Sequence, residues 1–262
     1  YNGNSCSGTA ISGAPTNWRD GGYSYKATLT GTSNYNTSTS SCATLVINKI
    51  ANPMTFTTPQ NGSVTFVTSA QSKTFTAASS AQGTVTYTIQ SQKDKNGTAV
   101  TYFSIPTDTT ASFSVAGNTP VANSTYTIVI RATAAGGTNY NSKTIDMTYT
   151  LTVNRQGIAF PSCTSKTYTG SSQELFAAHT SGEYTNSAIN GTNVGDYTGD
   201  LTPSANYQWN SGSSVTSART LTCSITKSDT TTTATAVSTK RDMINFYEQQ
   251  TVGVLILKYY GK

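Results

Sequence analysis

The sequence is poor in charged residues. Only 10% of its 262 residues are Asp, Glu, Lys or Arg, against about 25% in a typical soluble protein. The formal net charge of +5 is spread thinly, and no basic run is longer than Lys240-Arg241. Nucleic-acid-binding surfaces carry clustered Lys and Arg. We therefore expect no nucleic-acid partner and interpret the charge as a mildly basic solvated surface.

The sequence also lacks any long hydrophobic run. No stretch reaches the roughly 18–20 apolar residues that a membrane-spanning helix needs, so we expect no membrane insertion within this chain. Neither an initiator Met nor a signal peptide is present. We therefore expect the sequence to be a processed or excised piece of a longer protein.

Residues that carry catalytic chemistry are scarce. A Ser-His-Asp triad would have to use His179, the single histidine, and no Gly-x-Ser-x-Gly elbow accompanies it. Asp196 and Asp200 form a close acidic pair, but calcium needs about six to eight oxygen ligands. We interpret His179 as an exposed bystander and the two acids as a solvated turn. The expectation is a protein with no enzymatic activity, no cofactor and no metal.

The four cysteines do not form the Cys-x-x-Cys pairs of a zinc site. Pairing Cys6 with Cys42 and Cys163 with Cys223 would join an early strand to a late strand within each of two domains. Each bridge would stabilise its domain by about 3–4.7 kcal/mol, because it restricts the conformations of the unfolded chain. Such bridges indicate an oxidising, extracellular setting, and four unpaired buried thiols in a reducing compartment are the alternative.

The missing charge is replaced by Thr, Ser, Asn, Gly and 16 tyrosines. Disordered chains combine high charge with few aromatic and β-branched residues, which is the opposite of this composition. Thr, Val, Ile and Tyr favour pleated, half-buried strands. The fold class that we expect is therefore all-β.

One pattern occurs three times, in residues 21–49, 123–155 and 193–227. Alternating apolar and polar residues start a strand that packs one face on a core, and a Gly/Asn/Ser turn leads into a second strand. The pattern predicts the last hairpin of an immunoglobulin-like sandwich, with its first tyrosine near the tyrosine corner. Each copy has this tyrosine, an Asn-Tyr turn and a closing basic residue: Tyr23, Asn34-Tyr35 and Lys49; Tyr126, Asn139-Tyr140 and Arg155; Tyr197, Asn206-Tyr207 and Lys227.

The third copy carries a recognisable resemblance. Residues 158–227, with KTYTG, NVGDYTGDLTP, NYQW and LTCSITK, resemble the MBG-type immunoglobulin-like repeats of bacterial surface proteins. Residues 1–49 resemble the same family without its first strand. Residues 50–155 resemble the longer immunoglobulin-like or cadherin-like modules of bacterial surface and phage virion proteins. The calcium motifs of cadherins are absent, so the resemblance implies no metal.

The resemblance also gives a meaning to the Tyr-x-Gly sequences. Tyr1–Gly3, Tyr168–Gly170 and Tyr259–Gly261 would each mark the end of the first strand of a module. The expected architecture is a set of tandem immunoglobulin-like β-sandwich domains. It comprises an MBG-type domain lacking its first strand (1–49), an immunoglobulin-like or cadherin-like domain (50–155), a second MBG-type domain (156–227), and a Thr-rich linker with a terminal strand (228–262).

The terminal strand is apolar and has no partner in the sequence. Exposed edge strands invite pairing with another chain. We therefore hypothesise that this strand completes the first domain of another copy by strand addition, and the alternative is that both chain limits are arbitrary. The residues of this strand are Val252, Val254, Leu255, Ile256 and Leu257.

Short connections between stiff modules suggest a mechanical function. We expect a non-enzymatic extracellular structural protein, a surface stalk or adhesin segment, on a cell or virion surface. A phage fibre, capsid decoration or filament subunit joined by strand addition is the second hypothesis. A carbohydrate-binding module with a platform at Trp209 and Tyr207 is the third. The expected partners are other copies, neighbouring domains of the same protein, and a host surface or glycan.

Overall fold

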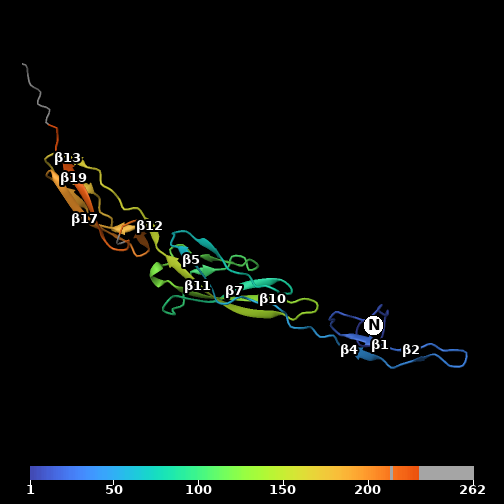
Figure 1. Ribbon diagram of the computed structural model, residues 1–262. Helices are drawn as coiled ribbons and strands as arrows, with labels where there is room; N and C mark the ends of the chain where they lie inside the picture. Colours follow the sequence, from blue (N-terminus) through green and yellow to red (C-terminus); the bar gives the residue numbers. More distant parts are fainter. Residues whose placement is uncertain (213–214, 230–262) are drawn as a thin grey trace, which may run out of the picture.

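The computed structural model describes residues 1–212 and 215–229, and these residues form an elongated molecule built almost entirely of strands (Figure 1). Across this part of the chain the only helix is a single 3₁₀ turn, η1 (Val121–Asn123). No helix within it is long and apolar enough to cross a membrane. The predicted fold class, all-β with immunoglobulin-like sandwiches, is confirmed.

The middle unit, residues 50–155, is a sandwich of two sheets with the strand orders β5-β11-β10-β7 and β6-β9-β8. Strand β5 runs parallel to β11, and the other neighbours are antiparallel. This arrangement is that of immunoglobulin-like domains. The strands are β5 (Gln60–Thr65), β6 (Gln71–Thr74), β7 (Val85–Lys93), β8 (Phe103–Ser104), β9 (Ser112–Val115), β10 (Tyr126–Ala134) and β11 (Lys143–Asn154).

The core of the middle unit follows from alternation along its strands. In β10 the side chains of Tyr126, Ile128 and Ile130 are fully buried, while the residues between them face outward. Burying side chains of this size stabilises a fold by about 1.5–3 kcal/mol each. Phe113 packs edge-on against Tyr149 across the sandwich, with ring centroids 5.2 Å apart. These contacts give the middle unit the larger of the two hydrophobic cores.

The C-terminal unit, residues 156–229, repeats this plan. Its main sheet has the order β13-β19-β17-β15, with β13 parallel to β19, and β14 pairs with β16. A short parallel pair, β12-β18, lies beside the middle unit. The strands are β12 (Gln156–Ile158), β13 (Lys166–Thr167), β14 (Gln173–Phe176), β15 (Tyr184–Thr185), β16 (Ile189–Gly191), β17 (Gly195–Pro203), β18 (Tyr207–Trp209) and β19 (Arg219–Thr226).

The N-terminal segment, residues 1–49, is much thinner. It contains two hairpin layers, β1-β4 and β2-β3, and only Cys6 and Ser24 are buried. Neither hydrophobic core includes any of its residues. Its strands are β1 (Tyr23–Tyr25), β2 (Thr28–Leu29), β3 (Ser38–Thr39) and β4 (Ala43–Leu45).

The structure corrects the interpretation of the Tyr-x-Gly sequences. Tyr1–Gly3 lies beside β1, with the terminal amine donating to the Ser24 carbonyl at 2.8 Å. Tyr168 instead lies beside the last strand of its unit, where its N–H donates to the Thr226 carbonyl at 2.9 Å. The two sequences therefore occupy different sheet edges, and their proposed equivalence is wrong. Tyr259–Gly261 lies outside the described residues.

We predict that Leu201→Ala lowers the free energy of unfolding of the C-terminal unit by about 2–5 kcal/mol, because it leaves a cavity in a closed core. Leu201 is fully buried there beside Trp209. Trp209 fluorescence during urea unfolding, in a Trp18→Phe background, reports on this unit. The neighbouring Thr202 is exposed, so Thr202→Ala should change the free energy by no more than about 0.5 kcal/mol. Equal effects of the two substitutions would contradict the assigned core.

Candidate functional site: the inter-module junctions

Corner tyrosines hold the loop at one end of the first two units. Tyr126 Oη donates to the Pro120 carbonyl at 2.6 Å, and Tyr23 Oη donates to the Asn17 carbonyl at 2.9 Å. In both cases the acceptor lies six residues before the tyrosine. Burial raises the pKa of the Tyr126 phenol. The same tether therefore fixes the same loop in two units.

The first junction is centred on Asn139, in the turn between β10 and β11. Asn139 Oδ1 accepts a hydrogen bond from the Trp18 N–H at 2.8 Å, and its Nδ2 donates to Asn17 Oδ1 at 2.9 Å. The Asn139 carbonyl accepts from the Ile50 N–H at 2.9 Å. One half-buried side chain therefore joins the tethered loop of the N-terminal segment to the tip of the middle unit.

The second junction is centred on Asn206, in the corresponding turn of the C-terminal unit. Asn206 Oδ1 accepts from the Val121 N–H at 3.0 Å, and its carbonyl accepts from the Gln156 N–H at 3.0 Å. The adjacent Tyr207 ring packs edge-on against Phe66 of the middle unit, with centroids 5.4 Å apart. This junction therefore combines two hydrogen bonds with an aromatic contact.

The two junctions have the same construction. Trp18 and Val121, whose N–H groups reach the asparagine side chain, each lie five residues before a corner tyrosine. Ile50 and Gln156, whose N–H groups reach the asparagine carbonyl, each follow the closing basic residue directly. The Asn-Tyr turn is therefore a docking element, and we call each copy an Asn-Tyr tip (34–35, 139–140 and 206–207).

The closing basic residues also act at the junctions. Arg155 Nε donates to the Ala205 carbonyl at 3.1 Å, next to the Asn-Tyr tip of the C-terminal unit. Lys49 Nζ lies 4.3 Å from the centroid of the Trp18 ring. A cation over an aromatic face is stabilised by about 0.5–1 kcal/mol at an exposed site. The basic residue that ends each of the first two repeats therefore marks these contacts in the sequence.

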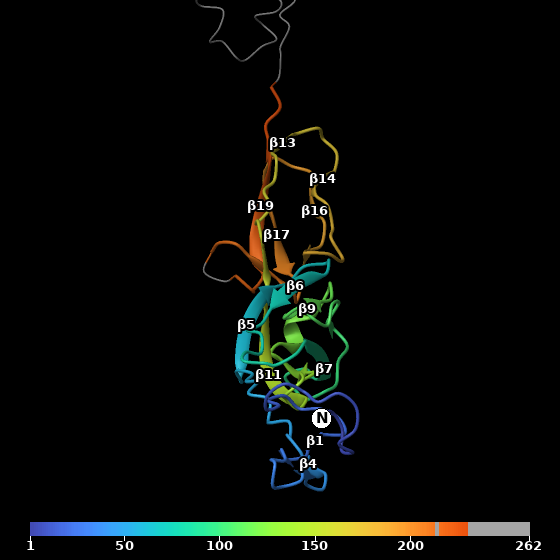
Figure 2. The same ribbon diagram turned by 90° about the vertical axis from the view of Figure 1, so that its right-hand side faces the viewer.

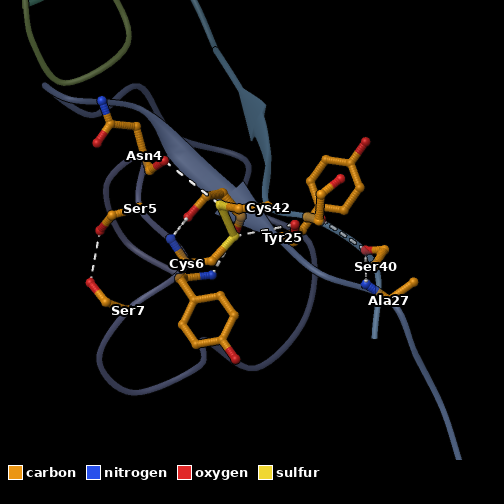
Figure 3. Close-up of a disulfide and its surroundings, with 11 residues drawn as sticks. Asn4, Ser5, Cys6, Ser7, Tyr25, Ala27, Ser40 and Cys42 are labelled. Carbon is orange, nitrogen blue, oxygen red and sulfur yellow. Dashed lines mark hydrogen bonds between the residues drawn. A yellow bond between two sulfur atoms is a disulfide. The ribbon is translucent and has the colours of Figure 1, made fainter. Parts of the chain in front are cut away.

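Two disulfides lie away from the junctions. The structure joins Cys6 to Cys42 and Cys163 to Cys223, with Cα–Cα distances of 5.7 Å and 5.3 Å, both within the usual range. The Cys6 N–H also donates to Ser24 Oγ at 2.9 Å, which links the disulfide to β1. Figure 3 shows the Cys6–Cys42 bridge beside Tyr25 of that strand. The first bridge therefore replaces a hydrophobic core in the N-terminal segment.

The glycan-platform hypothesis is wrong for Trp209. This side chain is fully buried, edge-on to Phe160 at 5.0 Å and 5.8 Å from Tyr184. Its Nε1 donates to the Ser217 carbonyl at 3.1 Å. The indole face is therefore closed to a sugar. Tyr207 is half-buried at the second junction, where its ring is in contact with another unit.

His179 is a structural residue of a short bridge. Its backbone exchanges hydrogen bonds with Asn186, and its ring lies 4.9 Å from the Tyr184 ring. The side chain is half-buried, so the expectation of an exposed bystander is wrong in that detail. Nothing in these contacts places a serine nucleophile beside the imidazole.

Asp196 and Asp200 lie on β17 and not in a turn, which corrects the sequence interpretation. Each carboxylate accepts a hydrogen bond from β19: Asp196 from Ser224 Oγ at 2.6 Å, and Asp200 from Thr220 Oγ1 at 2.7 Å. Among residues 1–212 and 215–229, no three His, Cys, Asp or Glu residues are grouped so that they could hold a metal ion.

An open groove runs along the N-terminal segment. It has a volume of about 340 Å³, and Ile11, Tyr25 and Leu45 are among its apolar lining residues. The strand predicted at residues 252–257 lies outside the described residues, so its addition to the first domain of another copy stays a prediction.

The main sheets of the middle and C-terminal units have equivalent strand orders, and the units are joined by junctions of the same construction. The chain is therefore a tandem immunoglobulin-like β protein. Solved structures to which the chain is similar include mouse protocadherin-24 EC1-3, with 13% sequence identity, coverage of 78% of this chain and 80% of that chain, and a TM-score of 0.35. The titin domains z1z2 in complex with telethonin are also similar, with 15% identity, coverage of 69% of this chain and 100% of that chain, and a TM-score of 0.32. The four N-terminal Ig domains of Dscam1 isoform 4.44 have 12% identity, coverage of 78% of this chain and 54% of that chain, and a TM-score of 0.28.

No protein-family model and no curated protein matches the chain. The MBG-type resemblance and the domain boundaries therefore stay predictions. Identities and TM-scores as low as those above carry no functional argument.

We predict that the double substitution of Cys6 and Cys42 by serine unfolds residues 1–49. The bridge joins cysteines 36 residues apart and contributes about 3–4.7 kcal/mol to the free energy of unfolding. The few buried side chains of this segment cannot replace that contribution. Limited proteolysis followed by mass spectrometry should show rapid cleavage within these residues only.

The matched control is the double substitution of Cys163 and Cys223 by alanine. The C-terminal unit should remain folded, though less stable, because its buried cluster persists. A protease-resistant segment 1–49 without its disulfide would contradict the prediction.

Proposed function

We propose that this chain is a non-enzymatic, rigid extracellular spacer, a segment of a surface stalk or adhesin. The observation that carries the proposal is that both junctions are built from the same asparagine-centred hydrogen bonds. A junction that recurs with the same partners defines the relation between neighbouring modules. A fixed relation between modules is the property that a spacer needs.

The linkers support stiffness because they are parts of the sheets. Domains in one chain move relative to each other unless their interface holds them. Here Ile50 pairs with Tyr140, and Gln156 pairs with Tyr207 at the start of β12-β18. Bending the first junction would break the hydrogen bonds of Asn139 to Asn17 and Trp18, and bending the second would break that of Asn206 to Val121. Each is worth about 0.5–1.5 kcal/mol.

An extracellular location is supported by the disulfides and the surface. Both bridges are of the structural kind that persists in oxidising compartments. Exposed strand positions are mostly Thr, Ser, Asn and Gln, as in the alternating pattern of β5. Such a surface remains hydrated without requiring charge.

A second candidate, a filament or virion subunit joined by strand addition, is favoured by the N-terminal segment. Tyr25 is largely exposed there and lines the open groove, and Val46, also largely exposed, lines a second pocket that shares Tyr23 and Leu45 with it. Exposed apolar side chains on a thin sheet favour the addition of a further strand. Residues 252–257 remain the proposed donor.

Rigidity can be measured by the distance between spin labels on either side of the second junction. Thr88 on β7 and Thr198 on β17 are exposed and suit labelled cysteine substitutions. We expect a narrow distance distribution in the native chain. Asn206→Ala should broaden it, because two modules lose the side chain that joins them, while the melting of each unit is preserved.

Asn61→Ala on β5, also exposed, is the matched control and should leave the distribution narrow. The measurement is made on dilute protein, so that it reports on single molecules. A broad distribution in the native chain would contradict the spacer function.

A further inference from the structure

The N-terminal segment carries a third Asn-Tyr tip. In its turn, the Thr32 N–H donates to the Tyr35 carbonyl at 2.9 Å, and in the middle unit the Gly137 N–H donates to the Tyr140 carbonyl at 3.2 Å. The donor precedes the tyrosine by three residues in both turns. The local fold of this tip is therefore that of a docked tip.

This third tip is exposed. Tyr35 is 76% exposed and Leu29, on the same hairpin, is 71% exposed, whereas Asn139 and Asn206 are half-buried at their junctions. The β2-β3 hairpin lies at one end of the molecule and points away from the middle unit (Figure 1). An exposed aromatic at a tip whose two copies are docked indicates a binding surface.

The opposite end of the molecule, near β13 and β19, carries a surface equivalent to the one that binds an Asn-Tyr tip in the middle unit (Figure 2). In the middle unit, the Phe66 N–H donates to the Asn154 carbonyl at the end of β11, and Phe66 receives Tyr207. In the C-terminal unit, the Tyr168 N–H donates to the Thr226 carbonyl at the end of β19. Tyr168 therefore occupies the position of Phe66, and it is 39% exposed.

The loop before the corner tyrosine at this end has a different tether: Tyr197 Oη donates to a carbonyl four residues before it, whereas Tyr23 and Tyr126 donate to a carbonyl six residues before. Thr192 lies five residues before Tyr197, the position held by Trp18 and Val121 in the other units. Its N–H donates to Tyr197 Oη at 3.2 Å, and Tyr197 Oη donates to the Asn193 carbonyl at 3.0 Å. Docking would transfer the Thr192 N–H from the phenol to an asparagine side chain, so the number of hydrogen bonds would not fall.

We propose that two copies of this chain join end to end. The Asn-Tyr tip of one copy docks on the C-terminal unit of the other, with Tyr35 against Tyr168 and Asn34 Oδ1 on the Thr192 N–H. The proposal rests on the spacer function above, because it extends the same junction between molecules. The contact uses different surfaces on the two copies, so it forms open chains and not closed dimers.

The contact between separate copies is weak. Within the chain a linker holds each pair of modules together, at an effective concentration in the millimolar range. Between copies this advantage is absent, and small interfaces give transient complexes. Association is therefore expected at high micromolar to millimolar concentration, or where many copies are arrayed on one surface.

Sedimentation equilibrium of the full chain, from micromolar to millimolar concentration, tests the proposal. We expect the weight-average mass to rise with concentration beyond that of a dimer. Tyr35→Ala and Tyr168→Ala should each weaken association at least about tenfold, the loss that about 1.4 kcal/mol produces. Asn61→Ala, at an exposed position of β5 that lies in neither proposed contact, is the control and should leave association unchanged.

Mixing the two variants gives a sharper test. The Tyr35→Ala copy keeps its receiving end and the Tyr168→Ala copy keeps its tip, so the mixture should form dimers and nothing longer. Each variant alone should remain monomeric. Circular dichroism of both variants checks that they are folded, which the exposure of the two tyrosines favours.

Three outcomes would overturn the proposal. One is a monomer at every concentration, and another is association that survives both tyrosine substitutions. The third is association that is lost in Leu255→Lys but kept in Tyr35→Ala, which would indicate strand addition. None of these affects the spin-label distances of the dilute protein, so the spacer function is judged separately.

Discussion

The arrangement of the modules depends on one hydrogen bond, between an asparagine side chain and a backbone N–H at the end of the preceding module. Backbone N–H groups near an interface need partners. The corner tyrosine fixes the loop that carries this N–H, as Tyr126 does for Val121 through the Pro120 carbonyl. The asparagine of the next module then satisfies the donor, so module structure and module alignment have a common cause.

The strands and their faces could be predicted from the sequence because alternation is a local property. Tyr126, Ile128 and Ile130 recur with period two, and the structure buries all three. The Asn-Tyr turns were also visible as turns. Their docking role was not, because Asn139 binds Asn17 at a sequence separation of 122. A turn pattern shows where the chain reverses and carries no information about which distant loop it meets.

The errors have a similar origin. Trp209 follows an Asn-Tyr turn and could face solvent, but Phe160, just after β12, and Tyr184, on β15, are distant in sequence and enclose it. The sequence around Asp200 resembles a turn because of its glycines. Gly199 instead lies within β17, where a Cβ atom would come within 2.7 Å of the Ile189 side chain. The glycine makes room for a core residue, which its neighbours in sequence do not reveal.

The chemistry of the junctions suits a protein that works in a variable medium. Asparagine amides and backbone groups carry no net charge, so salt screens their mutual hydrogen bonds little, whereas exposed ion pairs weaken as ionic strength rises. Charge enters only at the margins, through Lys49 over Trp18 and Arg155 on a carbonyl. Thus the alignment of the modules depends little on charge: the described units are joined by neutral hydrogen bonds whose geometry is set by tyrosine corners.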